Sequence, residues 1–256
     1  MTVVDIHPHV ISPDERHYPR APLGGKQSDW SRARPVSAEK MLAAMDEAGI
    51  EKAVLVQAST CYGHDNSYVA DSVAAYPKRF AGVFSVDMTA ADAPQRIRHW
   101  IGRGLKGLRV FIAGHTAAHD TRLDDPHSFP AWRCAIDTGI PVCVQMRQPQ
   151  LPQLETLLRE FPDARIVLDH MARDDGSNIL PLARHPNLFL KFTTHNVRDG
   201  TDLGRVVAAF GARRIAWGSN YPASEGTLAS LLAEAKRAVP AADQEWIFSG
   251  TANALY

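Results

Sequence analysis

Eight short apolar segments recur along the chain, and this regular spacing constrains the fold more than any other feature. Most of them are apolar throughout and rich in β-branched residues, which is typical of strands buried on both faces of a parallel sheet. Helix patterns lie between them, and such alternation predicts an α/β fold. The eight predicted strands are Val3–Ile6, Ala53–Val56, Gly82–Val86, Leu105–Phe111, Pro141–Val144, Arg165–Leu168, Leu188–Phe192 and Arg214–Trp217.

The intervening segments carry helix signals. Met41, Leu42 and Met45 recur at helical spacing, with Ser37 as a candidate N-cap and Gly49 as a stop. Between the sixth and seventh strands only a short helical turn is expected, around Leu180–Arg184. Further helices are predicted over Tyr68–Tyr76, Pro94–Trp100, Trp132–Thr138, Leu151–Glu160, Arg205–Phe210 and Leu228–Val239.

These units favour one architecture. The 256 residues give 32 for each of eight strand–helix units, and about 250 residues is typical of a (β/α)8 barrel. An open doubly wound sheet usually has a glycine-rich turn after its first strand, whereas here His7-Pro8-His9 follows. We therefore predict a single-domain (β/α)8 TIM barrel over residues 1–256. The polar segment Ser12–Arg34 should be the loop after strand one, on the active-site face.

Charge and composition exclude several classes of protein. Lys plus Arg and Asp plus Glu both total 28, so the net charge of zero argues against a nucleic-acid partner. No apolar run approaches the roughly 20 residues that span a bilayer, and the N-terminus does not resemble a signal peptide. The three cysteines match neither a disulfide framework nor a metal knuckle. We expect a cytoplasmic protein that acts on a small molecule, and a homo-oligomer remains open.

Three histidines follow predicted strands at the end where barrel enzymes carry their chemistry. His7 and His9 alternate at the end of strand one, so they should point the same way. His170 follows strand six and would reach the same barrel mouth. Converging imidazoles suit either a divalent metal ion or a developing oxyanion.

Other strand ends supply groups for substrate binding. Arg109 ends strand four, and its guanidinium can hold a carboxylate in a bidentate pair, with Arg147 or Arg173 as a second anion-binding group. Gln145 ends strand five and would hydrogen-bond the substrate. Asn220 follows strand eight and cannot act as a general base, so it should orient water or substrate.

Taken together in order, several motifs resemble the amidohydrolase superfamily, in particular the amidohydrolase-2 group that includes 2-pyrone-4,6-dicarboxylate lactonase and the sugar lactonases. Each motif alone is weak, but they run almost end to end at barrel-strand intervals. They are Asp5-Ile6-His7-Pro8-His9, Leu55-Val56-Gln57, Tyr62-Gly63-His64-Asp65-Asn66, Pro77-Lys78-Arg79-Phe80-Ala81-Gly82-Val83, Gly107-Leu108-Arg109, Leu168-Asp169-His170 and Trp217-Gly218-Ser219-Asn220-Tyr221-Pro222.

The resemblance implies a ligand set that this chain matches only in part. Metal-dependent members use the strand-one histidines, a strand-five His, Lys or Glu, a strand-six His and a strand-eight Asp. The chain matches at His7, His9 and His170 and departs at Gln145 and Asn220. The pyrone lactonase branch works without metal, and there histidines polarise the lactone carbonyl. The cofactor is therefore expected to be either absent or one divalent ion, zinc or manganese, held by the three histidines.

The departure at Asn220 has three explanations. The residue is native and another group is the base, with Asp169, His170 and His9 as candidates. Alternatively, it is an engineered replacement of Asp, or the protein has lost hydrolysis and kept binding. We favour a native Asn. Gln57 and Tyr62 are expected to line the pocket.

We predict a hydrolase that opens a small cyclic ester, or a related amide, that bears a carboxylate. Water would attack a carbonyl carbon while His7, His9 and His170 stabilise the developing oxyanion, directly or through a divalent ion. One alternative is a metal-dependent decarboxylase or hydratase of the same superfamily. The other is a barrel that binds a carboxylate ligand without turnover.

Overall fold

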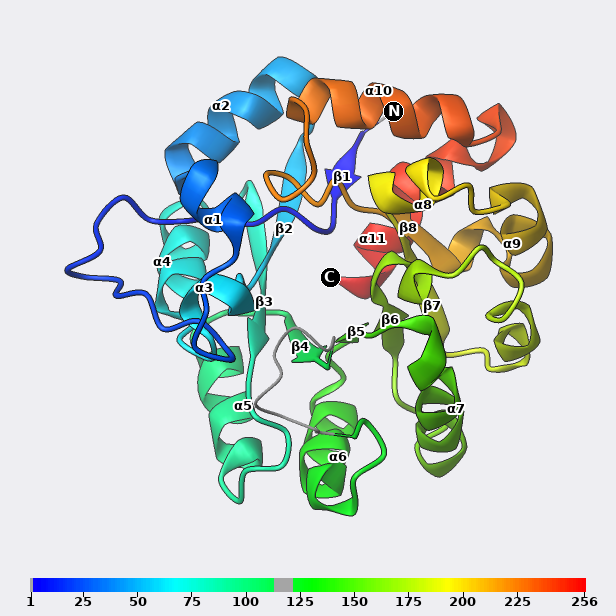
Figure 1. Cartoon of the computed structure of the whole chain (residues 1–256), viewed down its shortest axis with the longest axis horizontal. Coiled ribbons are helices and arrows are strands. Elements are labelled where there is room, and N and C mark those ends of the chain that lie inside the picture. Colours follow the sequence, from blue (N-terminus) through cyan, green and yellow to red (C-terminus); the bar gives the residue numbers. More distant parts are fainter. Residues whose placement is uncertain (1, 113–121) are drawn as a thin grey trace.

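The eight predicted strands are all present and form one parallel sheet (Figure 1). A computed structural model describes residues 2–112 and 122–256 of the chain. Each strand pairs with the next one in sequence, in the order β1 to β8. The strands are β1 Val4–Asp5, β2 Lys52–Val56, β3 Phe80–Ser85, β4 Gly107–Phe111, β5 Val142–Gln145, β6 Ile166–Leu168, β7 Leu188–Phe192 and β8 Ile215–Trp217.

The sheet curves back so that its last strand meets its first. The backbone N–H of Ile6, just after β1, donates to the carbonyl of Trp217 at the end of β8, at 3.1 Å. This contact brings the ends of the sheet together as a nearly closed barrel, and Figure 1 looks down into its centre. The predicted (β/α)8 barrel is confirmed.

Helices surround the barrel, and those predicted from sequence are present. Ser37 accepts a hydrogen bond from the Lys40 N–H as the N-cap of α2, and Gly49 ends that helix with a φ of 68°. Such a left-handed φ suits glycine. The short turn between β6 and β7 is a 3-10 turn over Leu180–Arg184. The predicted helices are α2 Ala38–Ala48, α4 Ser67–Ala75, α5 Ala93–Gly102, α6 Phe129–Thr138, α7 Leu151–Glu160, α9 Leu203–Phe210 and α10 Leu228–Ala238.

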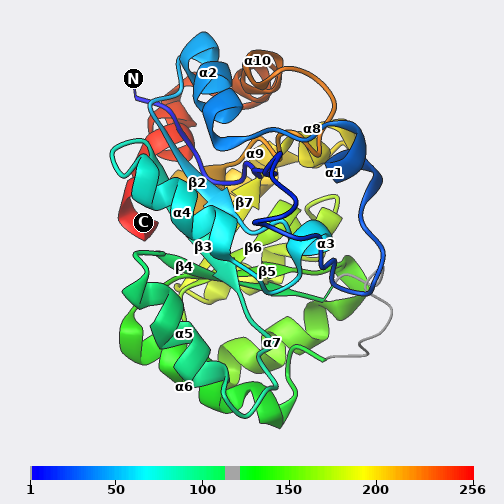
Figure 2. The ribbon, with the colours of Figure 1, turned by 90° about the vertical axis from the view of Figure 1, so that its left-hand side faces the viewer.

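Additional short helices occur that the sequence did not predict. Helix α1, Asp29–Ala33, lies in the segment after β1, and α3, Ser59–Tyr62, follows β2. Helix α8, Thr194–Arg198, follows β7, and the chain closes with a π-helical turn, Trp246–Gly250, and α11, Thr251–Leu255. Seen from the side, α1, α3 and α8 lie at the end of the barrel away from both termini (Figure 2).

The strands separate two layers of apolar side chains because successive residues point to opposite faces. On β2, Val54 and Val56 point into the barrel with Val83 and Cys143, whereas Leu55 packs outward against the helices. The outer layer is the larger core. No helix in the described part of the chain is long and apolar enough to cross a membrane.

Candidate active site at the barrel mouth

The three predicted histidines meet at the carboxyl ends of the strands. The ring centroid of His7 lies 4.9 Å from that of His9 and 4.7 Å from that of His170, both edge to face. All three are buried, and a fourth imidazole, His195, lies 5.3 Å from His170. The structure thus brings together residues that follow β1, β6 and β7 and are far apart in sequence.

The position of His7 depends on close packing between the ends of β1 and β8. One oxygen of the buried Asp5 carboxylate accepts hydrogen bonds from the His7 N–H at 3.0 Å and the Ser219 N–H at 2.8 Å. A Cβ on Gly218 would lie only 2.5 Å from the Cβ of His7, so glycine is required there. Asp5 and Gly218 are therefore positioning residues for the first histidine.

The hydrogen bonds of His9 and His170 define which ring nitrogen is free. Nδ1 of His9 lies 2.8 Å from the Val56 carbonyl, which can only accept, so Nδ1 donates. Nδ1 of His170 lies 2.9 Å from the Thr193 hydroxyl, which itself donates to Asn196. Both rings therefore present an unprotonated Nε2, which can accept a hydrogen bond.

Burial keeps these imidazoles neutral. Burial, assisted by the nearby Arg109 charge, lowers the pKa of His9 to about 3. Burial and the Arg173 charge lower the pKa of His195 to about 4. For His7 and His170 the pKa also falls well below the ordinary histidine value, chiefly through burial. At neutral pH the cluster can therefore accept protons but carries no charge of its own.

A buried carboxylate with two cations lies beneath the histidines. Asp169 is 2.8 Å from the Lys191 Nζ and 3.2 Å from the Arg109 Nε, and its Oδ1 is 3.7 Å from the His7 Nδ1. Burial would raise the pKa of Asp169, but the Lys191 and Arg109 charges outweigh it and hold the pKa below its ordinary value. One carboxylate and two cations leave this cluster with a net charge of +1. We call these three residues the cationic cluster.

The cationic cluster continues into the barrel interior through Cys143. The Lys191 Nζ lies 3.5 Å from the Cys143 Sγ, and this sulfur lies 3.2 Å from the hydroxyl of Tyr256. Lys191 has no exposed surface. Since Cys143 is smaller than the valines around it, it leaves space for the lysine side chain.

His170 begins an unusual turn of backbone. His170, Met171, Ala172 and Arg173 all have positive φ angles, between 50° and 55°. Non-glycine residues adopt this left-handed region at a cost of roughly 1–2 kcal/mol each. Asn196 supports the turn by donating from its side chain to the His170 carbonyl at 2.9 Å. The turn directs His170 toward His7 and brings Arg173 to the pocket rim.

Asn220 also has a positive φ, 56°, a region in which Asn and Asp are enriched. Its amide nitrogen lies 3.1 Å from the His195 Nε2 and 3.1 Å from the Ser224 hydroxyl. The amide nitrogen therefore has its partners, and the amide oxygen is left to accept a hydrogen bond. The chain thus places a neutral acceptor after β8.

A cavity of about 290 Å³ joins these residues. Seven of the predicted residues line it, together with Trp30 from α1, which stacks on His9 at 5.2 Å between ring centroids. His7 lies below the lining. The seven are His9, Arg109, Gln145, Arg147, His170, Arg173 and Asn220.

The three arginines of the cavity differ in their partners. Arg109 is buried, and it donates hydrogen bonds to Asp169 and to the Gln57 carbonyl, so much of its guanidinium is already paired within the protein. Arg173 holds Asp199 through two hydrogen bonds, at 2.7 and 2.9 Å. Arg147 has no carboxylate within ion-pair distance among the described residues. It is therefore the arginine with a guanidinium available for a ligand.

Gln145 offers an unused acceptor. Its side chain is only 6% exposed, and its Oε1 is buried without a hydrogen-bond partner among the described residues. Because buried polar atoms are usually paired, an orphan in a cavity wall is suited to contact a ligand.

Gln57 and Tyr62 lie elsewhere. The Gln57 amide donates to the carbonyls of Gly63 and Asp65, at 3.2 and 2.6 Å, and it fastens the loop after β2. The Tyr62 hydroxyl accepts from the Ser12 N–H at 2.8 Å and contacts Arg20. Neither residue lines the cavity; both support the loops that surround it.

Sequence reasoning missed Lys191, and it did not assign a role to His195. A lysine inside the apolar run Leu188–Phe192 was the available signal for the former, because a lysine is almost never fully buried unless it is paired. Trp30 was missed because it lies on a short helix in a segment that we expected to be a loop.

The arrangement of side chains does not fit a divalent metal ion. Within residues 2–112 and 122–256, no three His, Cys, Asp or Glu side chains are arranged to hold one. Asp169, the carboxylate beside His7, already has two cationic partners, and a metal ion there would meet the charges of Lys191 and Arg109. We therefore derive no step through a metal.

Strands that end in a cluster of histidines, arginines and a buried carboxylate at the barrel mouth define an enzyme of the (β/α)8 class. The sequence profile of the amidohydrolase family matches residues 4–256. The chain therefore belongs to the amidohydrolase family, as its motifs predicted.

The chain is similar in sequence to a curated protein and in fold to several solved structures. L-fucono-1,5-lactonase of Burkholderia ambifaria is 29% identical over an alignment 243 residues long, and the alignment covers 86% of this chain and 80% of the relative. A putative 2-pyrone-4,6-dicarboxylic acid hydrolase from Pseudomonas putida superposes with a TM-score of 0.83 at 22% identity, covering 99% of this chain and 97% of the other. A zinc-bound amidohydrolase from Burkholderia multivorans superposes with a TM-score of 0.79 at 18% identity, covering 100% and 99%.

Proposed function

We propose that the protein hydrolyses a small lactone that bears a carboxylate. The observation that carries the proposal is one cavity that combines neutral imidazoles with an arginine lacking a carboxylate partner, Arg147. The volume of about 290 Å³ lies near the lower end of ligand pockets and suits a small ring. The likeness to a sugar lactonase and to a pyrone dicarboxylic acid hydrolase supports the same reaction class.

The proposed mechanism uses the free ring nitrogens. Water donates a hydrogen bond to the His9 Nε2, and the Asn220 amide oxygen orients the same water. As the water oxygen attacks the carbonyl carbon, its proton passes to His9. Burial and the Arg109 charge keep the pKa of His9 low. The negative charge that develops on the carbonyl oxygen offsets the Arg109 contribution, so the imidazole becomes a better base as the reaction proceeds.

The positive charge of the cationic cluster, which lies beneath the histidines, polarises the carbonyl of the substrate. The net charge of +1 on the cationic cluster favours an oxyanion in a buried, water-poor site. His7 lies between Asp169 and the two neighbouring histidines, beneath the pocket lining. When the tetrahedral intermediate collapses, the ring carbon–oxygen bond breaks and the leaving oxygen receives the proton from His9. The product is the open hydroxy acid.

A panel of lactones tests the proposal. Protein purified without added metal and treated with a chelator should open lactones that carry a carboxylate, and their methyl esters should react more slowly. If no lactone is hydrolysed by the protein with or without added zinc or manganese, the reaction assignment is wrong. Turnover only after metal addition would instead support a metal-dependent member of the family.

Arg147→Met should weaken binding of the substrate carboxylate. A hydrogen bond to a charged group contributes about 1.5–3 kcal/mol, so KM should rise about 10- to 100-fold with little change in kcat. The KM for a neutral lactone should not change. Arg237→Met, on the exposed face of α10, is the matched control. An unchanged KM for the charged lactone would remove Arg147 from the binding site.

Asn220→Asp should place a carboxylate beside the attacking water. The left-handed backbone accommodates Asp as well as Asn, so the fold should be retained. A positioned general base contributes on the order of 100-fold or more, and we expect kcat to rise at least tenfold, with a new acidic limb in the pH–rate profile. A lower kcat would show that the Asn220 amide itself is required. Turnover by the Asp variant alone would identify the natural chain as a binding protein.

A further inference from the structure

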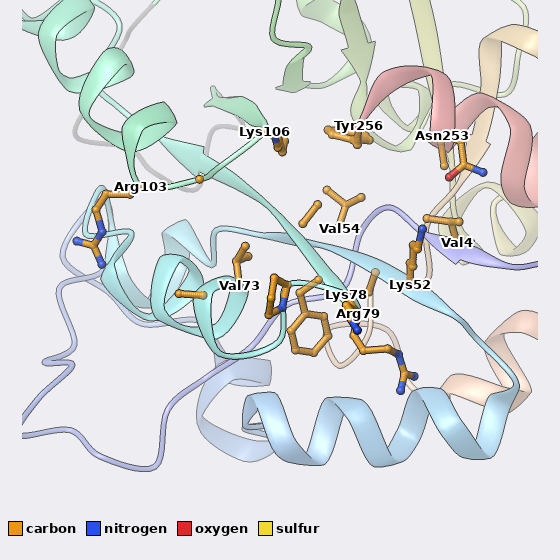
Figure 3. Close-up of a pocket in the computed structure, with 17 residues that line it drawn as sticks. Val4, Lys52, Val54, Val73, Lys78, Arg79, Arg103, Lys106, Asn253 and Tyr256 are labelled. Atoms are coloured by element: carbon orange, nitrogen blue, oxygen red, sulfur yellow. The ribbon is translucent and has the colours of Figure 1, made fainter.

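A second cavity lies at the opposite end of the barrel. It has a volume of about 750 Å³, and residues at the amino ends of the first four strands line it, including Val4, Lys52, Phe80 and Lys106. Part of α4 and the chain terminus at Tyr256 complete its wall (Figure 3). It shares no lining residue with the candidate active site. The chemistry of barrel enzymes lies at the other end, so the proposed reaction does not account for this cavity.

The charged side chains that line this second cavity are all positive. Five cationic side chains and no Asp or Glu line it, although the chain as a whole has a net charge of zero. Figure 3 shows the cations around the hollow rather than in one spot. The five are Lys52, Lys78, Arg79, Arg103 and Lys106.

Three of these cations lack a carboxylate partner. Arg79 pairs with Asp46 at 2.7 Å, and Arg103 pairs with Asp71 at 2.8 Å. No carboxylate among the described residues lies within ion-pair distance of Lys52, Lys78 or Lys106. These are three of only seven lysines in the chain. A concentration of uncompensated positive charge therefore surrounds the hollow.

The floor between the cations is apolar. Val4, Val54 and Val73 belong to it, and the ring of Tyr256 closes one side. Val4 and Val54 belong to the inner apolar layer of the barrel, which is thus reached from this end. A ligand that satisfied both features would carry an anionic group and a compact apolar body.

We propose that this second cavity is a binding site for a small amphiphilic anion, such as an aromatic carboxylate, sulfonate or phosphate ester. The volume lies within the range of small-molecule pockets. The lysines would supply the attraction to the anion, and burial of the apolar body against the valines would supply the hydrophobic contribution. An extended polyanion does not fit, because the cations enclose a single hollow.

Titration calorimetry with naphthalene-1-sulfonate tests the site. The sulfonate should bind at least tenfold more tightly than neutral 1-naphthalenemethanol and than inorganic sulfate, and its affinity should fall with added salt. Lys52→Gln combined with Lys106→Gln should weaken it at least tenfold. Lys40→Gln combined with Lys236→Gln removes the same charge from α2 and α10, outside the cavity, and should leave the affinity unchanged.

Ala74→Glu gives an independent arm of the same experiment. Ala74 is an exposed position on α4 at the cavity wall, so glutamate there adds an opposing charge without a folding cost. It should also weaken the sulfonate at least tenfold. Equal affinity in all variants would show that the sulfonate does not bind in this cavity and would overturn the proposal. Sedimentation showing a dimer that the double variant dissociates, without sulfonate binding, would make this face an interface and overturn it as well.

Discussion

Lys191→Met should destabilise the protein by about 3–5 kcal/mol and remove most of the lactone hydrolysis, the largest effect that we expect from a single change. The substitution takes away the ammonium 2.8 Å from Asp169 and leaves that fully buried carboxylate with Arg109 as its remaining cation. Breaking one side of a buried ion pair typically costs this much. Urea unfolding at pH 7.5 measures the stability, and initial hydrolysis rates measure the activity.

A double variant distinguishes the loss of the ion pair from the loss of packing around Lys191. Lys191→Met combined with Asp169→Asn removes both charges, and it should recover part of the lost stability and part of the activity, because the Arg109 charge then leaves the cluster with a net charge of +1, as in the parent protein. Lys236→Met on α10 serves as the control for lysine removal. A single Lys191 variant as stable as the parent protein would show that the pair contributes no net stability.

Mild acid should unfold the protein, which is the second large effect. The pKa values of buried His7, His9 and His170 lie below 6.5 in the folded state, because burial disfavours their charged form. Below pH 6.5 the unfolded chain therefore binds more protons than the folded chain. The free energy of unfolding is fully present above that pH and is lost as the pH falls toward 3. Each histidine contributes about 1.4 kcal/mol per pH unit, so three contribute about 4 kcal/mol per unit.

Since domains are stable by only about 5–15 kcal/mol, unfolding should occur within about one to four pH units below 6.5. Urea unfolding at pH 7.5, 6.5 and 5.5 gives the slope. His9→Gln should reduce this slope by about one proton, because glutamine can still donate to the Val56 carbonyl but does not titrate. A stability that is flat from pH 7.5 to 5.5 would contradict neutral, buried histidines.

The barrel was predictable from sequence because its evidence is local. Each strand is a short apolar run, and most of the helices carry their own cap or stop residue, as Ser37 and Gly49 do for α2. The predicted strands differ from the observed ones by only a few residues at their ends. The strand ends then indicated which side chains reach the mouth, since barrel topology places them together. Seven predicted residues line one cavity for this reason.

The features that we did not predict from the sequence depend on contacts between residues that are far apart in the chain. Arg109 was expected to hold a substrate carboxylate, but its Nε donates a hydrogen bond to Asp169, which is 60 residues away in the chain. Lys191 was treated as part of an apolar run. The alternation of residues along a strand does not show that Asp169 lies next to this lysine inside the barrel. Gln57 and Tyr62 are near the mouth in sequence order, yet their hydrogen bonds hold loops.

The left-handed turn from His170 to Arg173 restricts how this enzyme can diversify. Four successive residues in that region strongly disfavour β-branched side chains. A drifting sequence therefore has little freedom to remodel the loop after β6. The segment after β1 has no comparable run of strained backbone, and it delivers Trp30 onto His9. Selection for a new substrate would act first on that segment and would leave the turn after β6 as inherited framework.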